Sequence, residues 1–108
     1  MAGRVYVDRL FVFPSKNRAA FLVGERNGHQ WCHLWADDTG ALHAMAQRLG
    51  MKREWFQDKP GFPHYDLTPG KRMQALKHGA VERDLNDWLR HRTAALESEQ
   101  KQQGFDLG

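Results

Sequence analysis

The sequence predicts an α/β (α+β) domain in which a small antiparallel β-meander of three to four strands packs against two or three helices. Runs of β-branched and aromatic residues, separated by turn residues, occupy the first third of the chain. In the rest of the chain, apolar residues recur at the spacing of amphipathic helices. With 108 residues, of which 41% are hydrophobic and 27% charged, the chain has the size and composition of one globular domain and does not resemble a disordered protein.

Three strands are predicted in the first third of the chain. Val5–Val7 begins the first strand, and Leu10–Phe13 either continues it or forms a separate short strand that ends at a proline. Ala19–Val23 is predicted as the second strand and His29–Ala36 as the third, with a glycine-containing turn between them. Successive strands joined by short turns are typical of an antiparallel meander.

Side chains alternate between the two faces of a strand, and this alternation divides the predicted third strand. One face carries Trp31, His33 and Trp35, and the other carries Cys32, Leu34 and Ala36. The first face is bulky and contains a histidine, whereas the second is small and apolar. A Cys–His nucleophile pair is therefore not expected, because Cys32 and His33 lie on opposite faces.

Two helices follow with recognisable ends. The first has an N-cap within Asp37–Thr39, ends at Gly50 and carries four apolar residues at helical spacing, Leu42, Met45, Ala46 and Leu49. His43 falls on the edge of this apolar stripe, where it can face a cleft beside the core. The second helix begins at Thr68, with a proline in its first position, and extends to a histidine–glycine pair at residues 78–79.

The last part of the chain is predicted to complete the domain. Ala80–Val81 forms a short fourth strand or a loop, and Asp84 caps a third helix whose apolar positions are Leu85, Trp88, Leu89 and Leu96. An aromatic stretch over residues 55–65 is expected to lie against the domain. Residues 1–96 are thus expected to form a single compact α/β domain and residues 97–108 a flexible polar tail.

The sequence also bounds the cellular setting. No apolar run approaches the roughly 20 residues of a membrane-spanning helix, so no membrane partner is expected. The first residues lack the apolar core of a secretory signal, and a cytoplasmic location is the expectation. The single cysteine, Cys32, excludes an internal disulfide and any zinc site built on cysteine pairs.

Five polar side chains are candidates for a common site: Asp8, His33, His43, His64 and Asp66. Imidazoles and carboxylates bind divalent metals, which convert bound water into a nucleophile near neutral pH. The expected ligands of such a metal are His33, His43, His64 and Asp8, although no paired-histidine motif on one helix requires a metal. Without a metal, His64 and Asp66 can perform acid–base chemistry with His33 and His43 beside them. The alternative is that these residues have structural roles.

A second candidate feature is a pair of cations, Lys71 and Arg72, in the first turn of the second helix. Positive charge is unfavourable there, because the helix N-terminus is itself the positive end of the macrodipole. Together with Tyr65, these residues form a candidate binding site for a phosphate or carboxylate. The alternative is that both side chains extend into water or that one pairs with Asp66.

The predicted meander is basic as well as aromatic. Its cations are Arg4, Arg9, Lys16, Arg18 and Arg26, interleaved with Phe11, Phe13 and Phe21. Cations combined with aromatic rings are typical of surfaces that bind single-stranded nucleic acid. The net charge of +3 is modest, however, and the same residues describe an ordinary half-buried sheet.

Several short blocks occur in a characteristic order: Tyr6-Val7-Asp8, Trp31-x-His33-Leu34, Leu42-His43, Trp55-Phe56-Gln57 and His64-Tyr65-Asp66. In this order the chain resembles a family of small bacterial and phage proteins catalogued as a domain of unknown function. The resemblance covers roughly residues 4–89. It implies no activity, and the chain departs from the family pattern in a longer segment at 9–28 and in an additional tail.

Two functions remain in view. The first is a small phosphate- or nucleotide-recognising protein that acts as a hydrolase through a His/Asp cleft. The second is a non-enzymatic, phage-type accessory module that binds nucleic acid or a host protein through the basic meander. The sequence leaves open which of the two applies, which cofactor is present and what the oligomeric state is.

Overall fold

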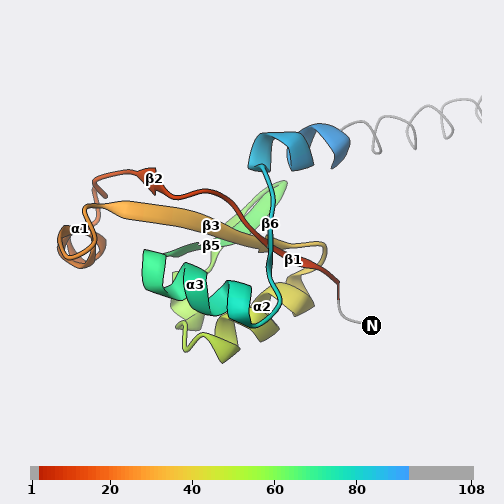
Figure 1. The fold of residues 1–108 in the computed structure, drawn as a ribbon, viewed down its shortest axis with the longest axis horizontal. Coiled ribbons are helices and arrows are strands. Elements are labelled where there is room, and N and C mark those ends of the chain that lie inside the picture. Colours follow the sequence, from red (N-terminus) through yellow and green to blue (C-terminus); the bar gives the residue numbers. More distant parts are fainter. Residues whose placement is uncertain (1–2, 93–108) are drawn as a thin grey trace, which may run out of the picture.

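The computed structural model describes residues 3–92, and both the predicted tail at 97–108 and the predicted apolar position at Leu96 lie outside them. Within this range the fold is a six-stranded mixed sheet with α-helices on both of its faces (Figure 1). The strands are β1 (Val5–Val7), β2 (Phe11–Val12), β3 (Gln30–Ala36), β4 (Gln57–Lys59), β5 (Phe62–Leu67) and β6 (Val81–Glu82). The helices are α1 (Arg18–Glu25), α2 (Thr39–Arg48), α3 (Pro69–Lys77) and a helix at 85–92, with a 3-10 turn at Arg53–Trp55. The α+β class is confirmed, with more strands than the sequence indicated.

The strand order is β4-β5-β3-β1-β6, and β2 pairs with the first half of β3. All pairs are antiparallel except β1 and β6, which run parallel. The long central strand β3 pairs with β1 so that Tyr6 lies opposite Trp35, and with β5 so that His33 lies opposite Asp66. This pairing places β1, which Asp8 follows, and β5, which contains Asp66, on the two sides of β3.

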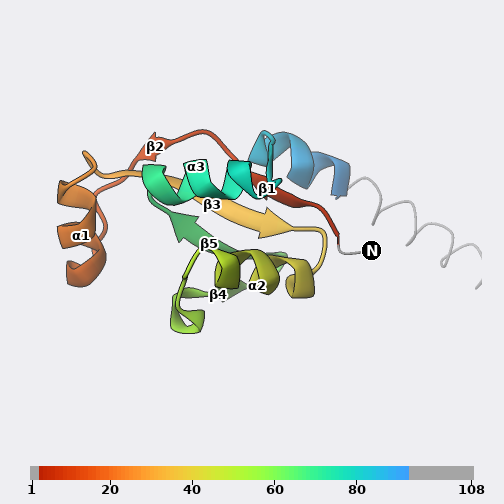
Figure 2. The same ribbon diagram turned by 60° about the horizontal axis from the view of Figure 1, so that its bottom comes forward.

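One face of the sheet is covered by α2 and α3, which pack side by side on it (Figure 2). The buried core between these layers is Val7, Cys32, Leu34, Leu42, Met45, Ala46, Leu49, Tyr65, Leu67, Ala75 and Ala80. The alternation predicted for β3 is confirmed, because Cys32 and Leu34 are fully buried in this core. The predicted caps are confirmed as well: Asp38 accepts from the backbone N–H of Ala41 at the start of α2, and Thr68 caps α3.

Residues 19–23 are not a strand, and the prediction of a three-strand meander was wrong at this point. They belong to α1, whose N-cap Asn17 accepts a hydrogen bond from the backbone N–H of Ala20 at 3.2 Å. A five-residue apolar run has no periodicity that separates helix from strand, so the cap and the two alanines decide in favour of helix. The short strand β2 pairs with β3 in place of the expected second strand.

The aromatic stretch at 55–65 contributes two strands that the sequence did not indicate. Strands β4 and β5 form a hairpin whose turn contains Gly61 at φ 79°, a conformation that favours glycine. The predicted short strand near Ala80 is confirmed as β6. No helix within residues 3–92 has the length and apolar character needed to cross a membrane.

Candidate functional site

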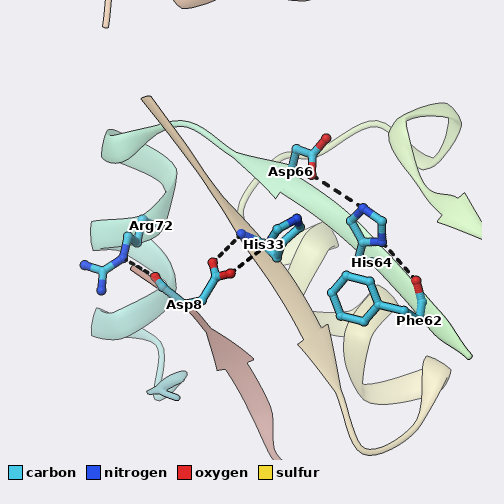
Figure 3. Close-up of polar contacts among 6 residues, drawn as sticks. All are labelled: Asp8, His33, Phe62, His64, Asp66 and Arg72. Atoms are coloured by element: carbon cyan, nitrogen blue, oxygen red, sulfur yellow. Dashed lines mark hydrogen bonds and ion pairs between the residues drawn. The ribbon is translucent and has the colours of Figure 1, made fainter. Parts of the chain in front are cut away.

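The sheet face turned away from α2 and α3, here called the open face, carries a cluster of polar side chains. The pairing of β3 with β5 places His33 beside Asp66, and the alternation along β5 places His64 on the same face as Asp66. Ligand atoms of His33, His64 and Asp66 all lie within 4.8 Å of one another. We call these three residues the His–His–Asp cluster (Figure 3).

Asp8 holds His33 in a defined orientation. One carboxylate oxygen of Asp8 accepts from the backbone N–H of His33 at 2.6 Å, and the other lies 2.7 Å from Nδ1 of the His33 ring. A carboxylate can only accept, so Nδ1 carries a proton and donates it to Asp8. The ring therefore presents Nε2 on its other side, and Figure 3 shows His33 between Asp8 and the two β5 residues.

Asp8 is itself anchored from α3. Nε of Arg72 donates to the backbone carbonyl of Asp8 at 2.9 Å, and another nitrogen of the same guanidinium lies 3.5 Å from a carboxylate oxygen of Glu82. Asp8 follows directly after β1, so this contact fixes the chain where the strand ends. The predicted candidate Asp8 thus contacts the cluster through His33.

His64 is buried, with only 3% of its surface exposed. Its Nδ1 donates to the backbone carbonyl of Phe62 at 2.9 Å, and the Phe62 ring stacks on the imidazole at 4.5 Å. Nε2 of His64 lies 3.5 Å from Oδ1 of Asp66. Burial lowers the pKa of His64 below its ordinary value, which keeps the ring neutral near pH 7.

Asp66 is oriented from the hairpin strand β4. Nε2 of Gln57 donates to Oδ2 of Asp66 at 2.6 Å, so Oδ1 remains on the side of His64. Gln57 did not emerge as a candidate from residue chemistry, because a lone glutamine predicts no function. Its place in the Trp-Phe-Gln block was the one available signal, since that block belongs to the ordered set that carries the family resemblance.

His43 and Tyr65 lie apart from the cluster, on the opposite side of the sheet. Nδ1 of His43 is 2.9 Å from the hydroxyl of Tyr65, and the ring of Phe56 contacts the His43 ring edge-on at 4.5 Å. Tyr65 points into the core because it alternates with His64 and Asp66 along β5. Burial lowers the pKa of His43 and raises the pKa of Tyr65. The expected grouping of His43 with His33 and His64 is therefore corrected.

Lys71 and Arg72 also have partners other than those expected. The ammonium of Lys71 donates to the backbone carbonyl of Leu49, next to the end of α2, where a cation is favourable. Arg72 binds Asp8 and Glu82 as described above. Neither cation pairs with Asp66 or lies with Tyr65 in a common anion site within the part of the chain that the structure describes.

A pocket of about 510 Å³ lies beside the cluster, where β3 ends and the helix at 85–92 crosses the open face. Its walls include Trp35 and Trp88, and its charged lining residues are Arg83, Arg92, Asp37 and Asp38. The ring of Trp35 lies 5.8 Å from that of Phe62, which in turn stacks on His64. One aromatic ring thus separates the pocket wall from the His–His–Asp cluster.

Comparison with known protein families identifies the chain. The model of the family described as a protein of unknown function (DUF4031) matches residues 5–95. The chain belongs to the DUF4031 family. Every residue of the cluster, together with Asp8 and Gln57, lies within the matched range. No curated protein and no solved structure matches this DUF4031 chain.

Proposed function

We propose that this DUF4031 protein is a hydrolase that acts on a nucleotide, or on another phosphate-containing substrate, at the His–His–Asp cluster. The convergence of His33, His64 and Asp66 within 4.8 Å carries the proposal. Two imidazoles and a carboxylate that meet on an exposed sheet face form a place where water is bound and loses its proton more easily than in bulk. A purely structural role would not require three ionisable side chains from two strands to face one another.

Solvent access supports the same conclusion. The side chains of His33 and Asp66 are 24% and 39% exposed, whereas His64 beneath them is almost completely buried. Water and a substrate can therefore approach the cluster from the open face, while its base stays fixed in the sheet. Cys32 does not compete as a nucleophile, because burial raises the pKa of its thiol to about 12.

The pocket beside the cluster supports a nucleotide as the substrate. The half-buried indole of Trp88 offers a surface for a planar heteroaromatic group, and Trp35, which is only 1% exposed, packs behind it. The two arginines of the pocket are balanced by two aspartates, so the pocket suits an uncharged base better than an anion. With the base in the pocket, the phosphate of a nucleotide extends past Phe62 to the His–His–Asp cluster.

Phosphate release from a panel of nucleoside 5′-phosphates and p-nitrophenyl phosphate tests the proposal. Asp66→Asn preserves the shape of the side chain and is expected to lower the rate by about 10²- to 10⁴-fold. Asp58→Asn, which changes an exposed carboxylate on the neighbouring strand β4, serves as the matched control and is expected to leave the rate unchanged. Absence of hydrolysis for the whole panel, or an equal rate for Asp66→Asn, would contradict the proposal.

A second candidate function is a contact with nucleic acid or a host protein through β2 and α1, which project at one end of the molecule (Figures 1 and 2). Exposed apolar side chains gather there: Val12, Phe13, Leu22 and Val23. Exposed cations lie in α1 and in the loops that flank β2 and α1, namely Arg9, Lys16, Arg18 and Arg26. Binding to nucleic acid should weaken steeply with salt and on Arg18→Ala, whereas a flat salt response would remove the nucleic-acid version of this candidate.

The free, buried thiol of Cys32 fits the reducing cytoplasm that the sequence leads us to expect.

A further inference from the structure

The contact between His64 and Asp66 brings two acceptor atoms together. Nδ1–H of His64 donates a hydrogen bond to the carbonyl of Phe62, so Nε2 of the neutral ring carries a lone pair. This lone pair faces Oδ1 of Asp66 at 3.5 Å, longer than the about 2.7–2.9 Å of a charge-assisted hydrogen bond. Two acceptors in this arrangement repel each other unless a proton, a bridging water or a metal ion lies between them, and a metal ion satisfies both lone pairs at once.

All three residues of the cluster are held from behind by a second group. Asp8 binds Nδ1 of His33, the carbonyl of Phe62 binds Nδ1 of His64, and Gln57 binds Oδ2 of Asp66. Metal-binding histidines characteristically donate their other N–H to a carboxylate or a backbone carbonyl, and ligating carboxylates are hydrogen-bonded in turn. Each of the three cluster residues therefore has its outer partner in place, and Figure 3 shows those of His33 and His64.

The distances agree with a common ion. Ligands at about 2.0–2.1 Å from a tetrahedral ion lie about 3.3 Å apart, close to the 3.5 Å between Nε2 of His64 and Oδ1 of Asp66. The separations in the cluster reach up to 4.8 Å, and a bound ion would require them to contract through small shifts of the two partly exposed side chains, His33 and Asp66. Because the cluster supplies three ligands on an accessible face, at least one coordination position stays open for water.

We propose that the His–His–Asp cluster binds a divalent transition-metal ion through Nε2 of His33, Nε2 of His64 and Oδ1 of Asp66. Two imidazoles and one carboxylate select ions such as Zn²⁺, Mn²⁺ or Fe²⁺ over Mg²⁺ or Ca²⁺, which prefer oxygen ligands. This ligand set differs from the one expected from the sequence. Asp66 is added as a ligand, whereas His43 lies on the other side of the sheet and Asp8 binds the back of the His33 ring. The inference rests on the site of the proposed function and extends it.

The ion would complete the chemistry that hydrolysis needs. It lowers the pKa of a bound water, so that the nucleophile forms near neutral pH. It also offsets the negative charge of Asp8 and Asp66, which would otherwise repel an approaching phosphate. A phosphate-containing substrate is therefore compatible with this site when the ion is present.

Titration of untagged protein with Zn²⁺ by calorimetry, and with Co²⁺ by visible absorption, tests the inference. One ion per chain is expected. Asp8→Asn should weaken binding by about 10- to 100-fold, as outer-shell changes do, and Asp66→Asn and His33→Gln should weaken it further. His43→Gln, on the other side of the sheet, and Asp58→Asn, on β4, are matched controls that should bind as the unchanged protein does.

The outcomes separate the two proposals. The metal site would be overturned if the unchanged protein bound neither ion, or if Asp66→Asn bound the ion with unchanged affinity. It would also be overturned if His43→Gln lost as much affinity for the ion as Asp66→Asn. If phosphate release persists in excess chelator, the hydrolase stands and the part assigned to the ion in hydrolysis is wrong. If the ion binds with the expected variant pattern but no substrate of the panel is hydrolysed, the metal site stands and the hydrolase falls.

Discussion

The strand register that places His33 on the open face also places Cys32 in the core, and chemical labelling of Cys32 tests it directly. Cys32 is 0% exposed, and burial raises the pKa of its thiol to about 12 from an ordinary 9.0. Because only the thiolate reacts, the reactive fraction of the native thiol near neutral pH falls by roughly a thousandfold. The competing route, labelling after transient unfolding, is slower than in the denatured chain by roughly 10³- to 10⁴-fold for a stability of about 5 kcal/mol.

Native Cys32 is therefore expected to react with iodoacetamide or Ellman's reagent at least about a thousandfold more slowly than in guanidinium. The matched variant carries His33→Cys with Cys32→Ala, which moves the thiol by one residue to a side chain that is 24% exposed in the native chain. Its labelling should come within about tenfold of the denatured rate, since the neighbouring position faces outward. If Cys32 labels as fast as this variant, the register of β3 and the assignment of His33 to the open face are both wrong.

Three further predictions concern stability. Leu34→Ala, at a fully buried position, should lower the free energy of unfolding in urea by about 2–5 kcal/mol, whereas Leu22→Ala on the exposed face of α1 should change it by less than about 0.5 kcal/mol. Asp38→Ala removes the N-cap of α2 and should cost about 0.5–2 kcal/mol; an unchanged urea midpoint would argue against that cap. Burial lowers the pKa of both His64 and His43 below 6.5, so the unfolded chain binds more protons just below that pH. In chelator, stability should therefore be fully present above pH 6.5 and fall by up to about 1.4 kcal/mol per pH unit for each histidine as the pH drops below it. A stability that is flat or rises on acidification to pH 5.5 would refute this sign.

Local signals predicted several elements correctly. The spacing of apolar residues and the caps Asp38 and Thr68 located α2 and α3, because helix ends depend on hydrogen bonds within a few residues. Alternation along β3 separated Cys32 from His33 correctly as well, because successive side chains of a strand point to opposite faces. Local signals gave the wrong element for residues 19–23. Five consecutive apolar residues fit a helix or a strand equally well, and the helix here depends on the Asn17 cap.

The site was predictable in its residue types and not in its grouping. Asp8, His33, His64 and Asp66 were identified as candidates, and the structure brings them together. His43 was grouped with them because its chemistry is the same, and a sequence contains no signal for the side of the sheet on which a helix packs. Gln57 was missed because its partner, Asp66, is reached only through the β4–β5 hairpin.

The sequence by itself determined which side chains can carry chemistry, which of them alternate along one strand, and where two helices begin. The tertiary structure alone decided that His33 lies opposite Asp66 and that α2 covers the face of Tyr65. The physical reason is that strand register and helix placement follow from burying Cys32, Leu34 and Leu67 in one core. These contacts join residues far apart in the chain, so no local pattern encodes them.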